Sequence, residues 1–513
     1  MTSIAIHTAA RRDSASSDGS SSWRAAFLRH AYIIPSFAIV LLVCAWFMTW
    51  GDWRFFDREV FCGFYDAQAR SILHGRLDVP PRAIGIEAFY FRGKTYGYFG
   101  IGPALLRIPL VLISNGMDGR WSRGLMFIAC FINLLCAYRI LLWARGTERV
   151  QTGIDRTLNS LFILCAGIGS TNIFIVDRCY TYHEAIMMGA TFALLFTVAI
   201  IYYFRSKNIR ALAAAGVFAF FSFHSRPTGG AGALLVLGIL AALFTLRAMT
   251  GKPIGHKFLS LPPIDRPFRH ALVAGIACVI IVAVYFGVNY GKFRTFDGVP
   301  VKYYGMYHTD PRRMVVTGGK QIHIENIPTG LASYFGMRGA TFHASFPWIY
   351  MSRTPSVLGH PAIDVVEQYS SVPISMPALG LLALLGAMLA LRGPRESIRH
   401  MRLPITGLMI GGGIILMTVG ITERYVHDLY PFLIVAAAAG VARVAEGKNP
   451  RRVTGLIAVL AVISIALNCT FALEYQRLAV WGVSPAKRVE MQNVQHAVDR
   501  FFHVQPAPVA DDE

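Results

Sequence analysis

The segment 55–107 carries the densest set of reactive side chains in the chain, and its carboxylates include Asp57, Glu59 and Asp66. A carboxylate beside a cavity can accept a proton from a hydroxyl group, which makes each of the three a candidate general base. The spacing also allows a structural role, because Asp66 and Arg70 lie four residues apart, as in an ion pair on a helix surface. Both interpretations stay open at this point, for all three carboxylates.

Further polar and aromatic residues near these carboxylates suit substrate binding. Glu87, Tyr96 and Tyr98 follow in the same segment. The two tyrosines could stack on a bound substrate or mark a membrane interface, where aromatic residues gather. His183 and Glu184 begin an apolar run, where they could bind substrate hydroxyls or a metal, or stabilise a helix N-terminus.

Four arginines are candidate partners for an anionic substrate group: Arg226 in H-S-R-P-T, Arg424 in T-E-R-Y, Arg178 and Arg338. Arg226 and Arg424 end or begin apolar runs, where a lipid phosphate would lie. A cation at that position can stabilise a departing phosphate. The alternative is an arginine that reaches from a helix end to the membrane surface.

The elements that must position these residues are membrane-spanning helices. The chain is 54% hydrophobic and 15% charged with mean hydropathy +0.46, whereas soluble domains are about 25% charged. Because the backbone must satisfy its own hydrogen bonds in lipid, long uniform apolar runs predict helices. The sequence therefore predicts an all-α polytopic membrane protein with about eleven spans, at the length expected for a bilayer. They are 31–50, 122–144, 158–176, 183–204, 209–223, 229–248, 270–290, 375–391, 404–421, 429–445 and 453–473.

Positive charge gathers in every second connection, which predicts the orientation. The other side carries two long aromatic loops, 51–121 and 291–374, within a membrane domain that spans 31–473. We expect a disordered cytoplasmic tail at 1–30 and a periplasmic C-terminal tail at 474–513. The membrane is expected to be a bacterial inner membrane, with the chemistry at its periplasmic face. This sorting accounts for much of the net charge of +20, so no nucleic-acid partner is expected.

Cysteines and metal motifs add little. Cys62 and Cys179 both fall on the predicted outer side, so a disulfide between them and two free thiols are both open. The sequence contains no CxxC or HExxH pattern. No metal ligands are therefore assigned and no cofactor is required, although a divalent metal stays open.

The first predicted loop also resembles a known superfamily. An acidic residue ahead of A-x-x-x-L-x-x-G is similar to the GT-C membrane glycosyltransferases. The stretch F-Y-D-A-Q-A-R-S-I-L-H-G-R-L-D-V-P (64–80), followed by I-E-A-F and G-K-T-Y-G-Y-F-G (93–100), resembles bacterial GT-C-like proteins. The resemblance is strongest over 55–125 and says nothing about the sugar.

This resemblance implies an inverting glycosyltransferase that uses a polyprenyl-phosphate-linked sugar donor in the membrane lipid. The acceptor would be an envelope glycan, lipid or protein, and the base would be an acidic residue of the first predicted loop. Many GT-C members carry a D-D or D-E pair near the position of Glu59, which is absent here. Asp66 fits the narrower pattern, and Asp57 or Glu59 the broader one, so the resemblance makes Asp66 the preferred base and keeps the other two as candidates. A transporter or flippase of lipid-linked sugars, and a ligase or polymerase, remain alternatives.

Overall fold

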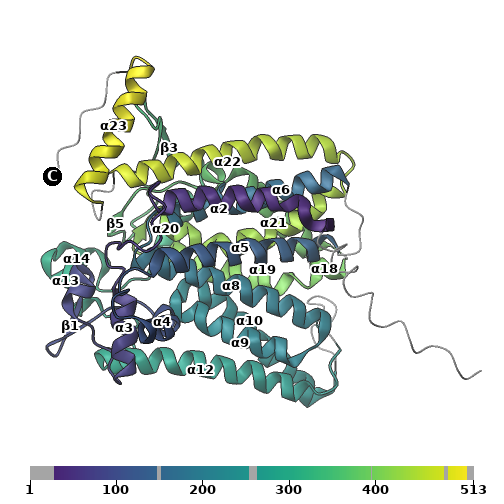
Figure 1. The fold of residues 1–513 in the computed structure, drawn as a ribbon. Coiled ribbons are helices and arrows are strands. Elements are labelled where there is room, and N and C mark those ends of the chain that lie inside the picture. Colours follow the sequence, from purple (N-terminus) through teal and green to yellow (C-terminus); the bar gives the residue numbers. More distant parts are fainter. Residues whose placement is uncertain are drawn as a thin grey trace, which may run out of the picture.

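The computed structural model describes residues 28–146, 152–252, 261, 263–393, 395–478 and 483–504. Most of the predicted tail 1–30, and parts of the predicted tail 474–513, lie outside them. Long helices run side by side in the described part, and residues 49–121 and 294–376 gather at one end of this bundle (Figure 1). We call that end the loop end. The described parts of the connections that the sequence marks as basic lie at the opposite end, as an alternating up-and-down path requires (Figure 1).

Twelve helices among the described residues build the bundle. They are α2 (Ile34–Met48), α5 (Ser122–Arg145), α6 (Gly153–Gly167), α7 (Thr171–Asp177), α8 (Thr181–Ser206), α9 (Ile209–Ser225), α10 (Pro227–Thr250), α12 (Pro267–Phe293), α17 (Pro377–Arg392), α19 (Arg402–Gly413), α21 (Tyr430–Ala445) and α22 (Pro450–Leu478). Short elements extend three of them: η1 (Ala31–Ile33) precedes α2, α18 (Glu396–Arg399) and η6 (Ile414–Met417) flank α19, and α20 (Glu423–Val426) with η7 (His427–Leu429) precedes α21.

The helices confirm a polytopic membrane fold. Eight helices among the described residues are long and apolar enough to cross a membrane, or nine if α6 and α7, which meet at a 40° bend, form one span. The bend follows from Ser170, whose side chain accepts a hydrogen bond from the N–H of Asn172 and so begins α7 afresh. The predicted spans 209–223 and 375–391 are the shorter apolar helices α9 and α17. The number eleven stays a prediction.

Small residues let the central helices approach closely. A Cβ atom at Gly386 of α17 would lie 1.7 Å from the carbonyl oxygen of Ala436 in α21, and one at Gly440 would lie 2.0 Å from that of Leu382. Contacts between small residues of this kind are how helices associate within lipid, where no hydrophobic force draws them together. The span that holds α21 is 89% buried, whereas the one formed by α12 is 17% buried and lies at the edge.

Short elements order the two long loops. The first contains α3 (Phe64–Leu73), η2 (Pro81–Ala83), η3 (Gly85–Glu87), the hairpin β1 (Phe89–Phe91) and β2 (Lys94–Tyr96), and α4 (Gly102–Ile113). The second contains η4 (Val301–Tyr303), α13 (Gly305–Thr309), α14 (Arg312–Thr317), η5 (Ile324–Asn326), α15 (Ile327–Phe335), the hairpin β3 (Ala340–Phe342) and β4 (Ile349–Met351), β5 (Val365–Val366) and α16 (Val372–Ser375). β5 pairs in parallel with β6 (Gly420–Ile421), which ties this loop to the turn after α19. The last helix, α23 (Pro485–Phe501), lies beyond α22.

Cys62 and Cys179 are free thiols in the structure and form no disulfide. All eight cysteines are reduced in the structure. The Cys62 thiol bonds to the carbonyl oxygens of Glu59 and Gly119, at 2.6 and 2.7 Å, and Cys179 bonds to that of Val176. The predicted alternative of a Cys62–Cys179 bridge is therefore wrong for this structure.

Candidate functional site

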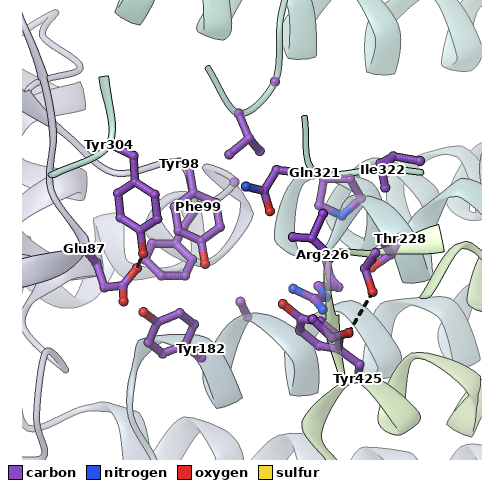
Figure 2. A pocket seen from close by; sticks show the side chains of 18 of the residues that line it. Glu87, Tyr98, Phe99, Tyr182, Arg226, Thr228, Tyr304, Gln321, Ile322 and Tyr425 are labelled. Carbon is purple, nitrogen blue, oxygen red and sulfur yellow. Dashed lines mark hydrogen bonds between the residues drawn. The ribbon is translucent and has the colours of Figure 1, made fainter. Parts of the chain in front are cut away.

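A cavity of about 500 Å³ opens at the loop end of the bundle. Both long loops line it, together with the loop-end termini of α8, α10 and α12 and the turn between α19 and α21. Helices thus supply its floor and irregular backbone supplies its walls, which is how binding sites on rigid scaffolds are usually built. Figure 2 shows side chains from the first loop facing side chains that belong to α10 and the turn.

One wall is acidic and aromatic. Glu87 ends η3 and accepts a hydrogen bond from the hydroxyl of Tyr304 in the second loop. The ring of Tyr304 stacks on Phe89, with centroids 4.6 Å apart, and Tyr98 stacks on Phe99 at 4.3 Å. Burial raises the pKa of Tyr304, so its hydroxyl stays protonated and donates to the carboxylate. The wall therefore presents a fixed carboxylate beside flat aromatic surfaces (Figure 2).

The opposite wall is cationic. Arg226, at the start of α10, donates from Nε to both oxygens of Asp428 at 3.1 Å. Arg424 donates to Glu367 at 2.8 Å and lies over the ring of Tyr182, 4.7 Å from its centroid. These pairs hold two guanidinium groups at the cavity surface, where they remain available to an anionic ligand.

Lys292 adds a cation without a carboxylate partner among the described residues. It lies in the last turn of α12 and lines the cavity, and its amine donates to the carbonyl oxygens of Gly97 and Phe99, at 2.8 and 3.4 Å. An ammonium group has three donors, so these two bonds leave one for a ligand. Glu87 is the corresponding carboxylate, because it too has no ion-pair partner among the described residues. The other cavity carboxylates, Asp364 and Glu367, form ion pairs with arginines.

Asp66, the preferred base of the sequence analysis, lies elsewhere. It is fully buried in α3, where its two oxygens accept hydrogen bonds from Arg107 at 2.8 Å and from the N–H of Gly119 at 2.7 Å. It does not line the cavity. Burial raises the pKa of Asp66, against the opposing effect of Arg107. The predicted surface pair with Arg70 is wrong, because Arg70 binds Asp118 instead.

The other two predicted bases also lie outside the cavity lining. The side chain of Glu59 is 8% exposed and accepts hydrogen bonds from Arg123, at 2.8 Å from Nε. The side chain of Asp57 is 42% exposed and lies 3.9 Å from the same arginine. Neither residue lines the cavity. Their catalytic role stays a prediction, and the geometry favours Glu87 over all three.

Glu184 and His183 belong to the helix packing beneath the loops. Glu184 accepts hydrogen bonds from Arg107 at 2.7 and 2.9 Å and from Ser122 at 2.7 Å, so one arginine joins α3, α4 and α8. His183 is fully buried and contacts the carbonyl oxygen of Ile175 at 2.9 Å. Neither lines the cavity. Among the described residues no group of three or more His, Cys, Asp or Glu side chains could hold a metal ion.

Four predicted binding residues do meet at the cavity: Glu87, Tyr98, Arg226 and Arg424. Tyr96 does not line it and packs on Phe293 instead. Lys292, Tyr304 and Arg313 also line the cavity but were not predicted from the sequence. A signal existed for Lys292, since it is a lysine in the last turn of an apolar run. Tyr304 and Arg313 carried none, because only the fold brings the second loop onto the first.

No family model and no curated protein matches the chain. Solved structures are similar to it. The apo oligosaccharyltransferase of Archaeoglobus fulgidus matches 95% of this chain at 12% identity and a TM-score of 0.46. ArnT from Cupriavidus metallidurans bound to undecaprenyl phosphate matches 92% at 12% identity and a TM-score of 0.45. The chain covers 61% of the archaeal enzyme and 72% of ArnT. These proteins are GT-C enzymes, the superfamily that the first-loop motif resembles, and the likeness concerns the fold alone.

Proposed function

We propose that this protein is an inverting glycosyltransferase that moves a sugar from a polyprenyl-phosphate carrier to an acceptor hydroxyl at the loop end. The observation that carries the proposal is the cavity itself. It combines Glu87, which lacks an ion pair among the described residues, with the amine of Lys292 and the guanidinium groups of Arg226 and Arg424. Sugar transfer with inversion needs that combination of one base and a cationic binding site for the leaving phosphate.

Glu87 is the general base in this proposal. Its carboxylate removes the proton from the acceptor hydroxyl as that oxygen attacks the anomeric carbon of the donor. The bond between the anomeric carbon and the phosphate oxygen breaks, and its electron pair leaves with the polyprenyl phosphate. Tyr304 orients the carboxylate by its hydrogen bond, and a positioned base of this kind typically accelerates a reaction about 10²–10⁴-fold.

Lys292, Arg226 and Arg424 stabilise the leaving phosphate. Charge builds up on the phosphate in the transition state, so preorganised cations lower the barrier without reorganisation of solvent. Arg226 and Arg424 are held by Asp428 and Glu367, which keeps their guanidinium groups in place before the donor arrives. In this proposal the protein's own cations perform the role that a divalent metal would otherwise take.

The lipid part of the donor accounts for the apolar part of the cavity. Phe223 of α9, Ala231 of α10, Val288 of α12 and Ile414 of η6 line it from the bundle side. These positions belong to helices that cross the membrane or end at its surface, so a prenyl chain could lie among them while its phosphate meets the cations. A soluble nucleotide sugar has no prenyl chain that would pack against this apolar lining.

The acceptor is proposed to be an envelope glycan, lipid or protein, and the membrane a bacterial inner membrane with the loop end in the periplasm. The rings of Tyr98, Phe99 and Tyr182 suit a sugar, because flat aromatic faces pack on the apolar face of a pyranose. Arginine and lysine residues gather in connections at the opposite end of the bundle, which is the cytoplasmic end by the positive-inside rule.

The proposal is tested in a deletion strain of the source organism by mass spectrometry of envelope glycans and lipid-linked sugars. The deletion should remove one glycoform and accumulate its lipid-linked donor, and the missing mass identifies the sugar. Glu87→Gln should behave like the deletion at normal expression. The matched control is Asp78→Asn, since Asp78 lies in the same loop, pairs with Lys94 and does not line the cavity. Full restoration by Glu87→Gln would refute the proposed base and favour a transporter.

A further inference from the structure

An aromatic surface at the loop end lies apart from the cavity. It consists of the hairpin from β3 to β4 (340–351) and of α23 with the residue that follows it (485–502), and we call it the outer ledge. Phe342 is 81% exposed, Phe501 76% and Phe502 55%. Trp348 contacts Phe502 with ring centroids 5.7 Å apart, so the exposed rings of the two elements are continuous.

Polar groups hold α23 on the protein. Its buried residues are Gln495 and Asp499, and its exposed side mixes Val489, Val494 and Phe501 with Glu490, Asn493 and Arg500. Asp499 accepts a hydrogen bond from the N–H of Phe346 at 2.7 Å, which attaches the helix to the hairpin. The large exposed rings of the outer ledge are the apolar surface that predicts an interaction site.

Two contacts fix the depth of the outer ledge relative to the spans. Lys487, in the first turn of α23, donates to Asp52 at 2.9 Å, and Asp52 lies just beyond Met48, where α2 ends. The N–H of Met351 in β4 donates to Glu474 in the last turns of α22, at 2.6 Å. The ledge is thus attached where two spans leave the bilayer, and not farther out.

α23 projects past the edge of the bundle. In Figure 1 the helix runs across the direction of α22 and extends sideways past that edge. α22 itself carries exposed apolar side chains, with Val459 and Val462 58% and 67% exposed. A bilayer that surrounds the spans would contact these side chains, and its surface would then lie next to the ledge.

From these relationships we infer that the outer ledge docks on the membrane surface, with Phe342, Trp348, Phe501 and Phe502 inserted among the lipid headgroups. Tryptophan and phenylalanine favour this interface. The lipid surface is the occupant that the attachment depth and the sideways projection select. This inference does not depend on the proposed chemistry of the cavity.

The test places single fluorescent labels on the full chain reconstituted in lipid nanodiscs, after Cys278 and Cys469, the partly exposed cysteines, are replaced by serine. Labels at Phe342→Cys and Phe501→Cys should be quenched by lipids that carry a quencher near the headgroup and shielded from aqueous iodide. Val462→Cys, on the lipid side of α22, serves as the buried-in-lipid control. Ile324→Cys, 73% exposed in the second loop, serves as the aqueous control.

Each outcome decides the inference. Lipid quenching at positions 342 and 501, with iodide quenching at 324, supports docking on the bilayer. Iodide quenching at all three positions overturns it, because the ledge would then stand free in water. Protection of 342 and 501 from both quenchers also overturns it, since a protein surface, such as a second copy of the chain, would then cover the ledge.

Discussion

The hydroxyl of Tyr304 donates to the carboxylate of Glu87, and this bond joins two loops across 217 residues of sequence. The backbone repeats the junction, because the N–H of Gly305 donates to the carbonyl oxygen of Ala88 at 2.9 Å. The cavity therefore exists only when the second loop is folded onto the first. Glu87, the one cavity carboxylate without an ion pair among the described residues, lies at this junction of the two loops.

Tyr304→Phe tests the junction of the two loops without disturbing the stacking on Phe89. The variant keeps the ring and removes the hydroxyl, which donates to Glu87 and also lies 3.1 Å from Sδ of Met306, so the fold should persist while the carboxylate loses its orientation. A hydrogen bond to a charged group contributes about 1.5–3 kcal/mol, which corresponds to a rate loss of about 10-fold or more. The measurement is the rate of glycoform formation at equal expression. An unchanged rate would mean that Tyr304 does not position Glu87.

Arg107→Met tests the buried network of the first loop. The substitution leaves Asp66 and Glu184 without their cation, and the loss of one partner from a buried ion pair costs about 3–5 kcal/mol. Thermal unfolding of the purified protein in detergent should show a clear fall in Tm. Arg70→Met is the matched control, because its pair with Asp118 is about one-third exposed and contributes at most about 1 kcal/mol. Equal effects of the two variants would contradict the assigned role of Arg107.

Gly100→Ala should distort the cavity wall. A Cβ atom at this position would lie 1.9 Å from the carbonyl oxygen of His224, at the end of α9, so the loop and the helix would have to separate. Overpacking of this kind costs about 1–3 kcal/mol. Gly63→Ala, where no atom lies within 4 Å of the added Cβ, should leave both Tm and activity unchanged. If Gly100→Ala is equally silent, the close approach of loop and helix is not required.

Cys62 should be unreactive in the folded protein. Burial raises the pKa of its thiol to about 12, so the thiol keeps its proton at any lower pH, and the reactive thiolate does not form near neutrality. Maleimide at about neutral pH should therefore label Cys62 only after the protein is unfolded. Reducing agents should not change the Tm of the protein. Rapid labelling of the native protein would show that the first loop opens.

The sequence predicted the bundle well because its signals are local. Apolar runs report directly on helices, and even the short spans 209–223 and 375–391 reappear as the apolar helices α9 and α17. The orientation that the sorting of Arg and Lys indicates stays a prediction. The site was predicted only in part, because its geometry depends on distant partners. Nothing near Asp66 reveals that Arg107, 41 residues later, neutralises it, and nothing near Glu87 reveals Tyr304.

The central claim, that Glu87 is the base, is tested most directly by quantifying the glycoform in strains that express Glu87→Gln or Asp66→Asn at equal amounts of folded protein. We predict that Glu87→Gln lowers glycoform formation by about 100-fold or more, as expected for the loss of a general base. Asp66→Asn should lower Tm and leave the rate per folded protein nearly unchanged. A silent Glu87→Gln together with an inactive, well-folded Asp66→Asn would contradict the account and return catalysis to the first helix of the loop.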